Sequence, residues 1–376
     1  MNSANTGSKN IFIEKGSILI YRVFDVAEEI DLKKVEALLR QGGDLRLELA
    51  ARNRNAVVVR NAPVRFGLDE VEFKLKDFNY RAETTATVWD YGAVSIAFQI
   101  PISKGTDWKS LLNLSSLLNA PSEIVTAIDQ AARKKSDEVV KLISTSLKKP
   151  NHWNFFEDYT IYFFEEVLGI KKANDLVKQT DLPALILGEI KDELADETRS
   201  AILENLFQYA DDDLVLIDWN AAVVFEPSGV KEVPDILEFS LTHLLEVRYY
   251  DDLLDKRLVE LYDSIEQGRQ GFWHNRFFEI SREANTRFIE FSEFLERMGN
   301  SLKVVGDFYL ARIFRASLRR YRVHDWQESI TRKMNLLAQV SDLLEGEANV
   351  RRSHFLELVI IVLILFEVVA AFFKFH

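Results

Sequence analysis

Residues 84–100, TTATVWDYGAVSIAFQI, predict a β-hairpin, and this hairpin decides the fold class of the first domain. In its second half, Val94, Ile96 and Phe98 alternate with small or polar residues, as in a strand with one apolar face. The turn is Asp90-Tyr91-Gly92, where glycine tolerates the left-handed conformation that a three-residue hairpin loop requires. The first domain is therefore expected to contain a sheet built from hairpins.

A second hairpin is predicted at residues 214–225, LVLIDWNAAVVF, around the turn Asp218-Trp219-Asn220. Asn220 stands where the first turn has Gly92, so we expect it to be left-handed. A duplicated unit explains this likeness, and so does common hairpin chemistry used twice. The other predicted elements before residue 230 are strands at 17–24, 56–60 and 155–164, and helices at 31–40, 108–118 and 122–146.

Composition excludes several classes of site. The chain has 376 residues, 47% hydrophobic and 28% charged, which is a globular composition with room for two or three domains. A net charge of -12 argues against nucleic-acid binding by overall charge alone. The absence of cysteine excludes disulfides, thiolate metal sites and cysteine nucleophiles. Residues 1–10 are polar and expected to be disordered, without a secretory or transit signal.

The chain changes character near Pro234, after which it contains no proline. Apolar residues from Leu237 to Ile265 then follow at spacings of three and four, as in a long helix with a heptad-like seam. Further helices are expected at 273–298 and 302–320. A last seam predicts a coiled-coil stalk with an oligomer interface, kinked near Gly346; its residues are Trp326, Ile330, Met334, Leu337, Val340 and Leu344.

Residues 355–373, FLELVIIVLILFEVVAAFF, predict a membrane-spanning helix. At ~1.5 Å per residue the segment covers about 28 Å, close to the thickness of a bilayer core. Glu357 lies near one end, whereas Glu367 lies near the centre and is expected to face a neighbouring helix. A buried helix in an oligomer core is the alternative. Basic residues before the segment outnumber those after it, which places the bulk of the protein on the cytoplasmic side.

Two acidic groups are candidate metal ligands. Asp211-Asp212-Asp213 precedes a predicted strand, and such a run is more often a solvated helix end. Asp251 and Asp252 interrupt the first helical seam. The favoured interpretation there is an ion pair with Arg248, three and four residues earlier, which fixes helix register. No catalytic residue, cofactor or small-molecule substrate is predicted, because the phosphate-loop, dinucleotide, nucleophile-elbow and HExxH motifs are all missing.

Residues 303–333 carry eight basic residues against three acidic ones, a charge of +5 within an acidic chain. Three interpretations are open for this region. It is a solvated face paired with acidic helices, a contact with anionic lipid headgroups, or a contact with RNA phosphates and bases. The basic patch consists of Arg312, Arg315, Arg319, Arg320 and Arg322.

Three stretches resemble the "required for meiotic nuclear division" family, a domain of unknown function found in bacteria, yeast and mitochondria. They are LVLIDWNAAVV at 214–224, ILEF at 236–239 and LEVRYYDDLLD at 245–255. The first hairpin turn and HFLE at 354–357 are similar as well, so the resemblance spans roughly residues 80–373. It implies a membrane-anchored protein that forms large homo-oligomers, with support of translation at the inner membrane for mitochondrial members. It implies no catalytic residue, and the missing transit peptide suggests a bacterial member.

The sequence therefore predicts an α+β N-terminal domain with β-hairpins, then an all-α coiled-coil region and one C-terminal transmembrane helix. The expected boundaries are 11–232, 233–322, 323–353 and 354–376. The expected function is a homo-oligomeric scaffold or tether without catalytic activity, anchored in a bacterial inner membrane. The alternatives are a metal-dependent enzyme with an acidic site in the first domain, and an RNA or ribosome tether that uses the basic helices. The sequence names no partner, copy number or ligand.

Overall fold

The computed structural model describes residues 11–40, 45–46, 62–75, 78–151, 153–190, 194–267 and 308–374, with residues 286, 289, 291–293 and 296. The chain divides into two compact units, one containing residues 1–249 and 296–324 and the other residues 250–295 and 325–376. The predicted disordered N-terminus and the strand at 56–60 lie outside the described residues, as does most of the helix at 273–298.

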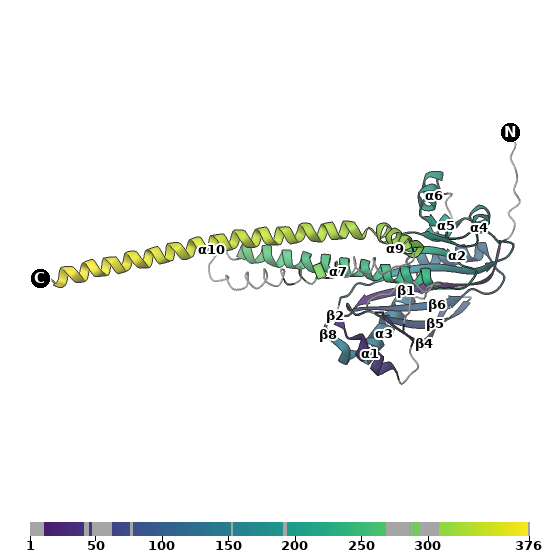
Figure 1. Cartoon of the computed structure of the whole chain (residues 1–376), viewed down its shortest axis with the longest axis horizontal. Helices are drawn as coiled ribbons and strands as arrows, with labels where there is room; N and C mark the ends of the chain where they lie inside the picture. Colours follow the sequence, from purple (N-terminus) through teal and green to yellow (C-terminus); the bar gives the residue numbers. More distant parts are fainter. Residues whose placement is uncertain are drawn as a thin grey trace. The chain divides into compact units, whose positions relative to one another are not determined.

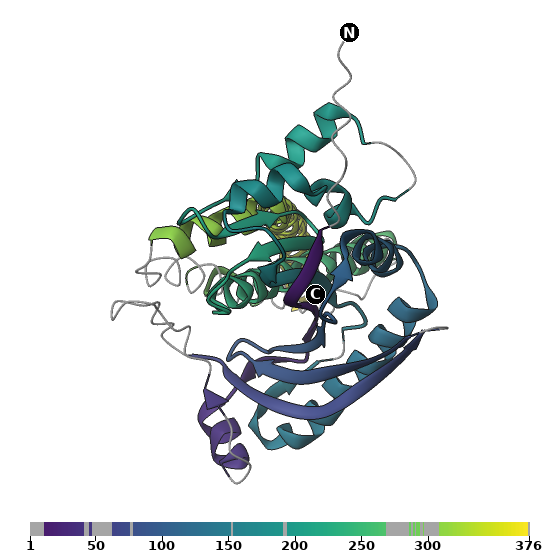
Figure 2. The ribbon, with the colours of Figure 1, turned by 90° about the vertical axis from the view of Figure 1, so that its right-hand side faces the viewer.

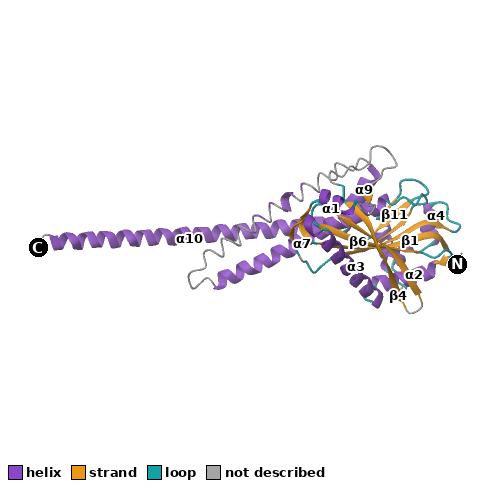
Figure 3. Ribbon diagram, turned by 90° about the horizontal axis from the view of Figure 1, so that it is seen from below, coloured by secondary structure: helices purple, strands orange, loops and turns teal. Residues whose placement is uncertain are grey.

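The first unit is built on a ten-stranded sheet (Figures 1 and 3). Its strand order is β10-β11-β12-β9-β1-β6-β5-β4-β3, and β7 pairs with β1 at the side of this path. A separate pair is formed by β2 (Ala27–Ile30) and β8 (Leu147–Pro150). The strands of the large sheet are β1 Phe12–Asp25, β3 Leu45–Arg46, β4 Val64–Leu75, β5 Phe78–Val88, β6 Ala93–Pro101, β7 Thr106–Asp107, β9 Glu157–Val167, β10 Leu206–Phe207, β11 Leu214–Ile217 and β12 Ala221–Phe225.

Both predicted hairpins are confirmed, as β5–β6 and β11–β12, and they flank the central pair β1–β9. Their attachments to that pair differ, because β6 runs antiparallel to β1 whereas β12 runs parallel to β9. A duplicated unit would repeat the same pairing. The difference favours hairpin chemistry used twice.

Four of the six helices between the strands, α1, α2, α3 and α5, begin at a capping side chain. The six described helices are α1 Leu32–Leu39, α2 Trp108–Asn119, α3 Glu123–Leu142, α4 Ala173–Gln179, α5 Leu182–Leu187 and α6 Asp196–Leu203, with a 3-10 turn at Ser144–Ser146. The side chains of Asp31, Asp107 and Ser122 each accept a hydrogen bond from the backbone N–H three residues later. Each cap satisfies a donor that the first helical turn otherwise leaves unpaired.

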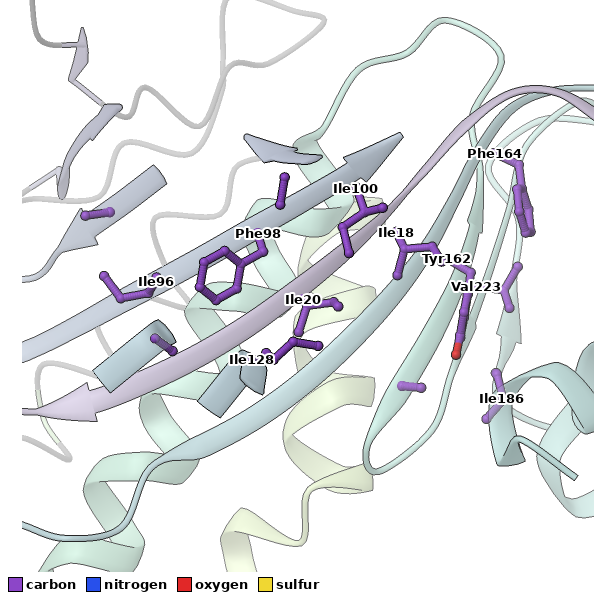
Figure 4. Close-up of a cluster of buried hydrophobic side chains, with 14 of the residues drawn as sticks. Ile18, Ile20, Ile96, Phe98, Ile100, Ile128, Tyr162, Phe164, Ile186 and Val223 are labelled. Carbon is purple, nitrogen blue, oxygen red and sulfur yellow. The ribbon is translucent and has the colours of Figure 1, made fainter. Parts of the chain in front are cut away.

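Side chains alternate along each strand, so the sheet has two different buried faces. One face carries Ile18, Ile20, Phe98 and Tyr162, which join residues of α1, α2, α3 and α5 in the main hydrophobic core (Figure 4). Figure 2 shows the curved strands β4–β6 with helix behind them, in keeping with the contacts of α3 to β4 and β6. The intervening residues of β1, such as Tyr21, are buried on the opposite face.

Two helices later in the chain supply the partners of that opposite face. They are α7 (Glu232–Gln267), of which the part up to Tyr249 belongs to the first unit, and α9 (Phe308–Arg320). Arg65 of β4 pairs with two carboxylates of α7, and α9 contacts β11. An N-terminal domain of mixed α and β structure followed by helices thus matches what the residues predict.

The two hairpin turns use different backbone geometry. Gly92 is left-handed, with φ of 99°, and a Cβ at this position would lie 1.6 Å from the Ala27 carbonyl oxygen, so only glycine fits. The expectation of a left-handed Asn220 is wrong, because Asn220 is absent from the positive-φ residues of the described chain. Its side-chain amide instead donates to Asn119 Oδ1 at 2.9 Å, and the Asp218 N–H closes the turn on the Ala221 carbonyl.

The last helix, α10, runs as one helical element from Val323 to Lys374, through Gly346. The prediction of a membrane-spanning helix at 354–376 is wrong: in the part of the chain that the structure describes, no helix is long and apolar enough to cross a bilayer. The physical reason lies in the exposed carboxylates of Glu357 and Glu367. They enclose a described apolar run, residues 358–366, that covers only about 14 Å of a core roughly 30 Å thick.

The expected anchoring in a bacterial inner membrane is wrong for the same reason, because it depended on this membrane-spanning helix. The residues of the predicted oligomer stalk differ in how deeply they are buried. Ile330, Met334 and Leu337 are buried within the single chain, while Trp326 and Val340 are partly exposed. The side chain of Leu344 lies outside the described residues. The first part of the predicted seam therefore serves packing inside the second unit.

Candidate functional site

Charged residues join α7 to the sheet. The guanidinium of Arg65 on β4 contacts Asp235 at 2.7 Å, also contacts Glu238, and donates through Nε to Thr87 at 3.1 Å. Burial alone would lower the pKa of Arg65, but the carboxylates of Glu238 and Asp235 raise it. Burial raises the pKa of Asp235 to about 6 despite the nearby arginine. The Glu238 side chain of this cluster is fully buried. The ion pairs of Arg65 with Asp235 and Glu238 therefore hold α7 in register on the sheet.

The first hairpin turn contacts the next part of α7. The hydroxyl of Tyr91 lies 2.6 Å from that of Thr242. His243 packs edge-on against Phe239 and Phe314, and its Nδ1 lies 2.7 Å from the Phe239 carbonyl. Burial lowers the pKa of His243 to about 4, so the ring is neutral at pH 7. A neutral, fully enclosed imidazole packed in this way supports the core.

The second hairpin turn is the attachment point of α9. Asp218 is buried and accepts a hydrogen bond from Arg320 Nε at 2.6 Å. The Tyr159 hydroxyl donates to the carbonyls of the same turn, and its ring packs against Tyr321 at 5.4 Å between centroids. Trp219, the middle residue of the turn, is 63% exposed. Of the three turn residues, two are structural and one faces solvent.

The basic patch is split by this attachment. Arg320 is paired with Asp218, whereas Arg312, Arg315, Arg319 and Arg322 are exposed. Arg312 lies over the Phe207 ring of β10, with its Cζ 5.1 Å from the ring centroid. The opposite side of α9 is buried. The patch is thus an outward face of a helix that is fixed on the sheet.

The residues of the acidic run 211–213 differ in their surroundings. Asp211 is highly exposed and lies 3.4 Å from Lys172. Asp213 is buried and accepts hydrogen bonds from the backbone N–H groups of Tyr209 and Ala210. Among the described residues, no group of three or more His, Asp or Glu side chains is arranged to hold a metal ion.

Two polar residues near the middle of the first helical seam, Arg248 and Asp251, have partners that local sequence does not reveal. Arg248 donates two hydrogen bonds to Glu157, the first residue of β9, at 2.7 and 2.9 Å. Asp251 pairs with Lys333 of α10 at 2.8 Å, and Asp252 pairs with Lys256 at 2.7 Å. Burial raises the pKa of Glu157 to about 7, and Arg248 opposes this shift. A register role for Arg248, Asp251 and Asp252 stays a prediction, and the structure adds Glu157 and Lys333 as partners of Arg248 and Asp251.

The C-terminal part of α10 presents a contrasting surface. Between residues 356 and 366, nine large apolar side chains are 53–72% exposed: Leu356, Leu358, Ile360, Ile361, Val362, Leu363, Ile364, Leu365 and Phe366. We call residues 356–366 the α10 apolar segment. Glu357, the second residue of this segment, lies 3.3 Å from His354, and Glu367, directly after the segment, is exposed. An exposed apolar run of this kind is a candidate binding surface.

Comparison with known proteins places the chain in a family. The family described as "Uncharacterized protein MJ0711, N-terminal domain" matches residues 15–232, more than half of the chain, so the chain belongs to that family. The "Uncharacterized protein MJ0711" of Methanocaldococcus jannaschii is 22% identical over 230 residues, which cover 61% of this chain and 70% of that protein. No solved structure matches. The matched region coincides with the sheet domain and ends where α7 begins.

Proposed function

We propose that this protein is a non-enzymatic scaffold whose copies associate through the α10 apolar segment. One observation carries the proposal, the exposure of nine large apolar side chains within eleven consecutive helical residues. An amphipathic surface helix would leave a polar face to water, but here apolar residues surround the helix. Such a helix is stable when other protein surface covers it.

The lengths of the two long helices explain why, among the described residues, α7 does not cover this segment. Lys333 of α10 contacts Asp251 and Asp255 of α7, so these positions lie level with each other within the second unit. Figures 1 and 3 show α7 and α10 side by side in this part. Both helices run onward from there, and α7 ends at Gln267. The α10 apolar segment begins more than twenty residues after Lys333, which at ~1.5 Å per residue is beyond the end of α7.

A second copy of the same helix is the partner that fits. Leu358 and Leu365 follow the buried Leu337 by three and four whole heptads, so they continue the face that α10 already uses for packing. Heptad seams are self-complementary because equivalent layers of two helices interlock. Branched and leucine side chains also dominate the segment, as in helical oligomer cores.

The resemblance to the "required for meiotic nuclear division" family supports the same proposal, because it implies large homo-oligomers. Its extension to this chain, including a link to translation, is part of the proposal. The stretch LVLIDWNAAVV supplies the hairpin β11–β12 near one edge of the sheet, and LEVRYYDDLLD lies within α7. These stretches supply structural elements of the fold, which supports the proposal of a non-enzymatic scaffold.

Sedimentation velocity of the full-length protein tests the proposal. We expect a species larger than the 43.4 kDa chain at micromolar concentration, and a shift to monomer in Leu358→Glu/Leu365→Glu. The matched control is Asn335→Glu/Gln339→Glu, which adds the same two charges at exposed polar positions of α10 and should leave the oligomer intact. A monomeric wild-type protein at tens of micromolar would refute the proposal, and so would an oligomer that survives the first double substitution.

A further inference from the structure

Helix α9 carries a cationic face in a chain whose net charge is -12. Its thirteen residues contain four arginines and no acidic residue. Arg312, Arg315 and Arg319 follow each other at spacings of three and four, so they project from one side of the helix, and all three are exposed. Within the described residues, neither Arg315 nor Arg319 forms an ion pair. In the part of the chain that the structure describes, no acidic side chain balances Arg315 or Arg319.

The face is held rigid by the buried side of the same helix. Ser317 donates to Ser240 of α7 at 2.6 Å, and Arg320 binds Asp218 of the hairpin turn. Phe314 stacks on Phe239 with ring centroids 5.3 Å apart. These contacts fix the backbone of α9 before any ligand binds. Binding to its exposed arginines therefore does not have to order the helix, and the entropic cost of binding is lower.

Exposed aromatic rings lie at both ends of this face. At the C-terminal end, the ion pair of Asp218 with Arg320 brings the hairpin turn to α9, and the next residue, Trp219, is 63% exposed. At the N-terminal end, Tyr209 packs against Tyr309 of α9 at 5.4 Å and is 65% exposed. Large aromatic side chains beside unpaired arginines are the combination that binds nucleotides by stacking and by phosphate contacts.

We propose that the α9 basic face, defined as Arg312, Arg315 and Arg319 with Trp219 and Tyr209, binds a single-stranded nucleic acid. The arginines contact backbone phosphates, and the exposed rings stack on unpaired bases. The surface is a helix exterior flanked by rings, without a second basic element in the described residues that would follow the other strand of a duplex. Single strands expose the bases that the rings require.

An anionic membrane is the other partner that a basic helix suggests, and the burial of α9 argues against it. Interfacial helices insert their apolar face between lipids while basic residues contact the headgroups. In α9 the apolar face is already covered by the protein, since Leu310, Ile313 and Phe314 are buried. What remains for binding is charge and aromatic surface, which matches a nucleic-acid strand better than a bilayer.

Fluorescence anisotropy of the full-length protein with labelled 20-nucleotide oligo(U) and oligo(dT) tests the proposal. With three phosphate contacts, the logarithm of affinity should fall against the logarithm of salt concentration with a slope of about -2. Arg315→Gln/Arg319→Gln should weaken binding about tenfold or more at 50 mM salt and reduce the slope by about 1.4. Both residues are exposed, so thermal stability should be unchanged.

Two controls make the result specific. Lys134→Gln/Lys141→Gln removes two exposed charges from α3 and should leave affinity unchanged. Trp219→Ala should weaken binding at least about fivefold without altering the salt slope, because stacking carries no charge, whereas Phe155→Ala at another exposed ring should not. Asp212→Asn, on the loop that carries Tyr209, should strengthen binding. A difference between oligo(U) and oligo(dT) identifies the kind of strand.

The proposal fails if neither oligonucleotide binds at 50 mM salt, or if the α3 variant loses as much affinity as the α9 variant. Heparin that binds equally well, together with indifference to Trp219→Ala, would show a general polyanion site and overturn base stacking. Binding to phosphatidylglycerol vesicles in the absence of oligonucleotide binding would assign the face to a membrane surface.

Discussion

Removal of Arg65 tests how α7 is held on the sheet. Arg65 on β4 is the cation between Asp235 and Glu238, and these two carboxylates are largely or fully buried. Arg65→Met keeps most of the side-chain length and removes the charge. Breaking a buried ion pair by removing one partner costs about 3–5 kcal/mol, because the remaining charge is left without compensation. Arg65 itself is about a quarter exposed, which favours the lower end of that range.

The predicted cost depends on pH. Burial raises the pKa of Asp235 to about 6 even with Arg65 present, and loss of the arginine raises it further. For an acid whose native pKa is raised, stability is present at low pH and is lost as pH rises through the native pKa. Arg65→Met should therefore destabilise the α7 contact by about 3 kcal/mol at pH 8 and by much less at pH 5.

Hydrogen exchange followed by mass spectrometry measures this effect locally. A cost of about 3 kcal/mol corresponds to roughly 150-fold faster opening of amides in residues 236–249, with peptides from β9 as the internal reference. Arg65→Met/Asp235→Asn/Glu238→Gln should recover most of the protection at pH 8, because no buried charge is left unpaired. Equal losses at pH 5 and pH 8, or no recovery in the triple variant, would refute the electrostatic reasoning.

Two further predictions concern the hairpin end of the sheet. Burial raises the pKa of Asp25 to about 7, so the native protein loses stability as pH rises from about 4 to 7; Asp25→Asn should flatten this slope in chemical unfolding at pH 5 to 8, and identical slopes would contradict the assignment. Gly92→Ala should prevent accumulation of folded protein, because its Cβ would meet the Ala27 carbonyl; a variant with an unchanged thermal midpoint would show that the turn has another way to close.

Local sequence patterns predict correctly the strands and helix starts that depend on neighbouring residues. The alternation of Val94, Ile96 and Phe98 predicts the strand β6, and Asp31 predicts the start of α1 as its N-cap. Asn220 shows the limit of this reasoning. Its residue type permits a left-handed turn, yet a long-range hydrogen bond to Asn119 accompanies a different conformation. A side chain 101 positions away is invisible to a turn rule.

The charged pairs of the sheet domain were beyond prediction for the same reason. Arg248 has acidic residues three and four positions later, which is the spacing of a helical ion pair, but it binds Glu157 from β9. Arg65 meets Glu238 across 173 positions. Helical spacing identifies which residues share a face, whereas the tertiary fold decides which partner that face meets.

The α10 segment failed as a membrane prediction because its summed apolar content was given more weight than its two acids, of which Glu367 was expected to face a neighbouring helix. Seventeen of nineteen apolar residues predict insertion by sum, while Glu357 and Glu367 divide the run whose side chains the structure describes. The same observation gives the exposed apolar surface a different meaning. The proposed association of copies through the α10 apolar segment would leave the carboxylates of Glu357 and Glu367 hydrated near the two ends of the apolar run.

The arginines of α9 show why the fold is needed to separate structural from binding residues. In the sequence, Arg315, Arg319 and Arg320 are equivalent members of one basic patch. In the structure, Arg320 reaches the buried Asp218, whose charge requires a partner, so its loss should destabilise the domain. Arg315 and Arg319 are exposed, so their loss should leave stability unchanged and alter binding alone. A substitution series along this helix therefore separates the two roles in a single element, because neighbouring residues of the same type have opposite expected effects.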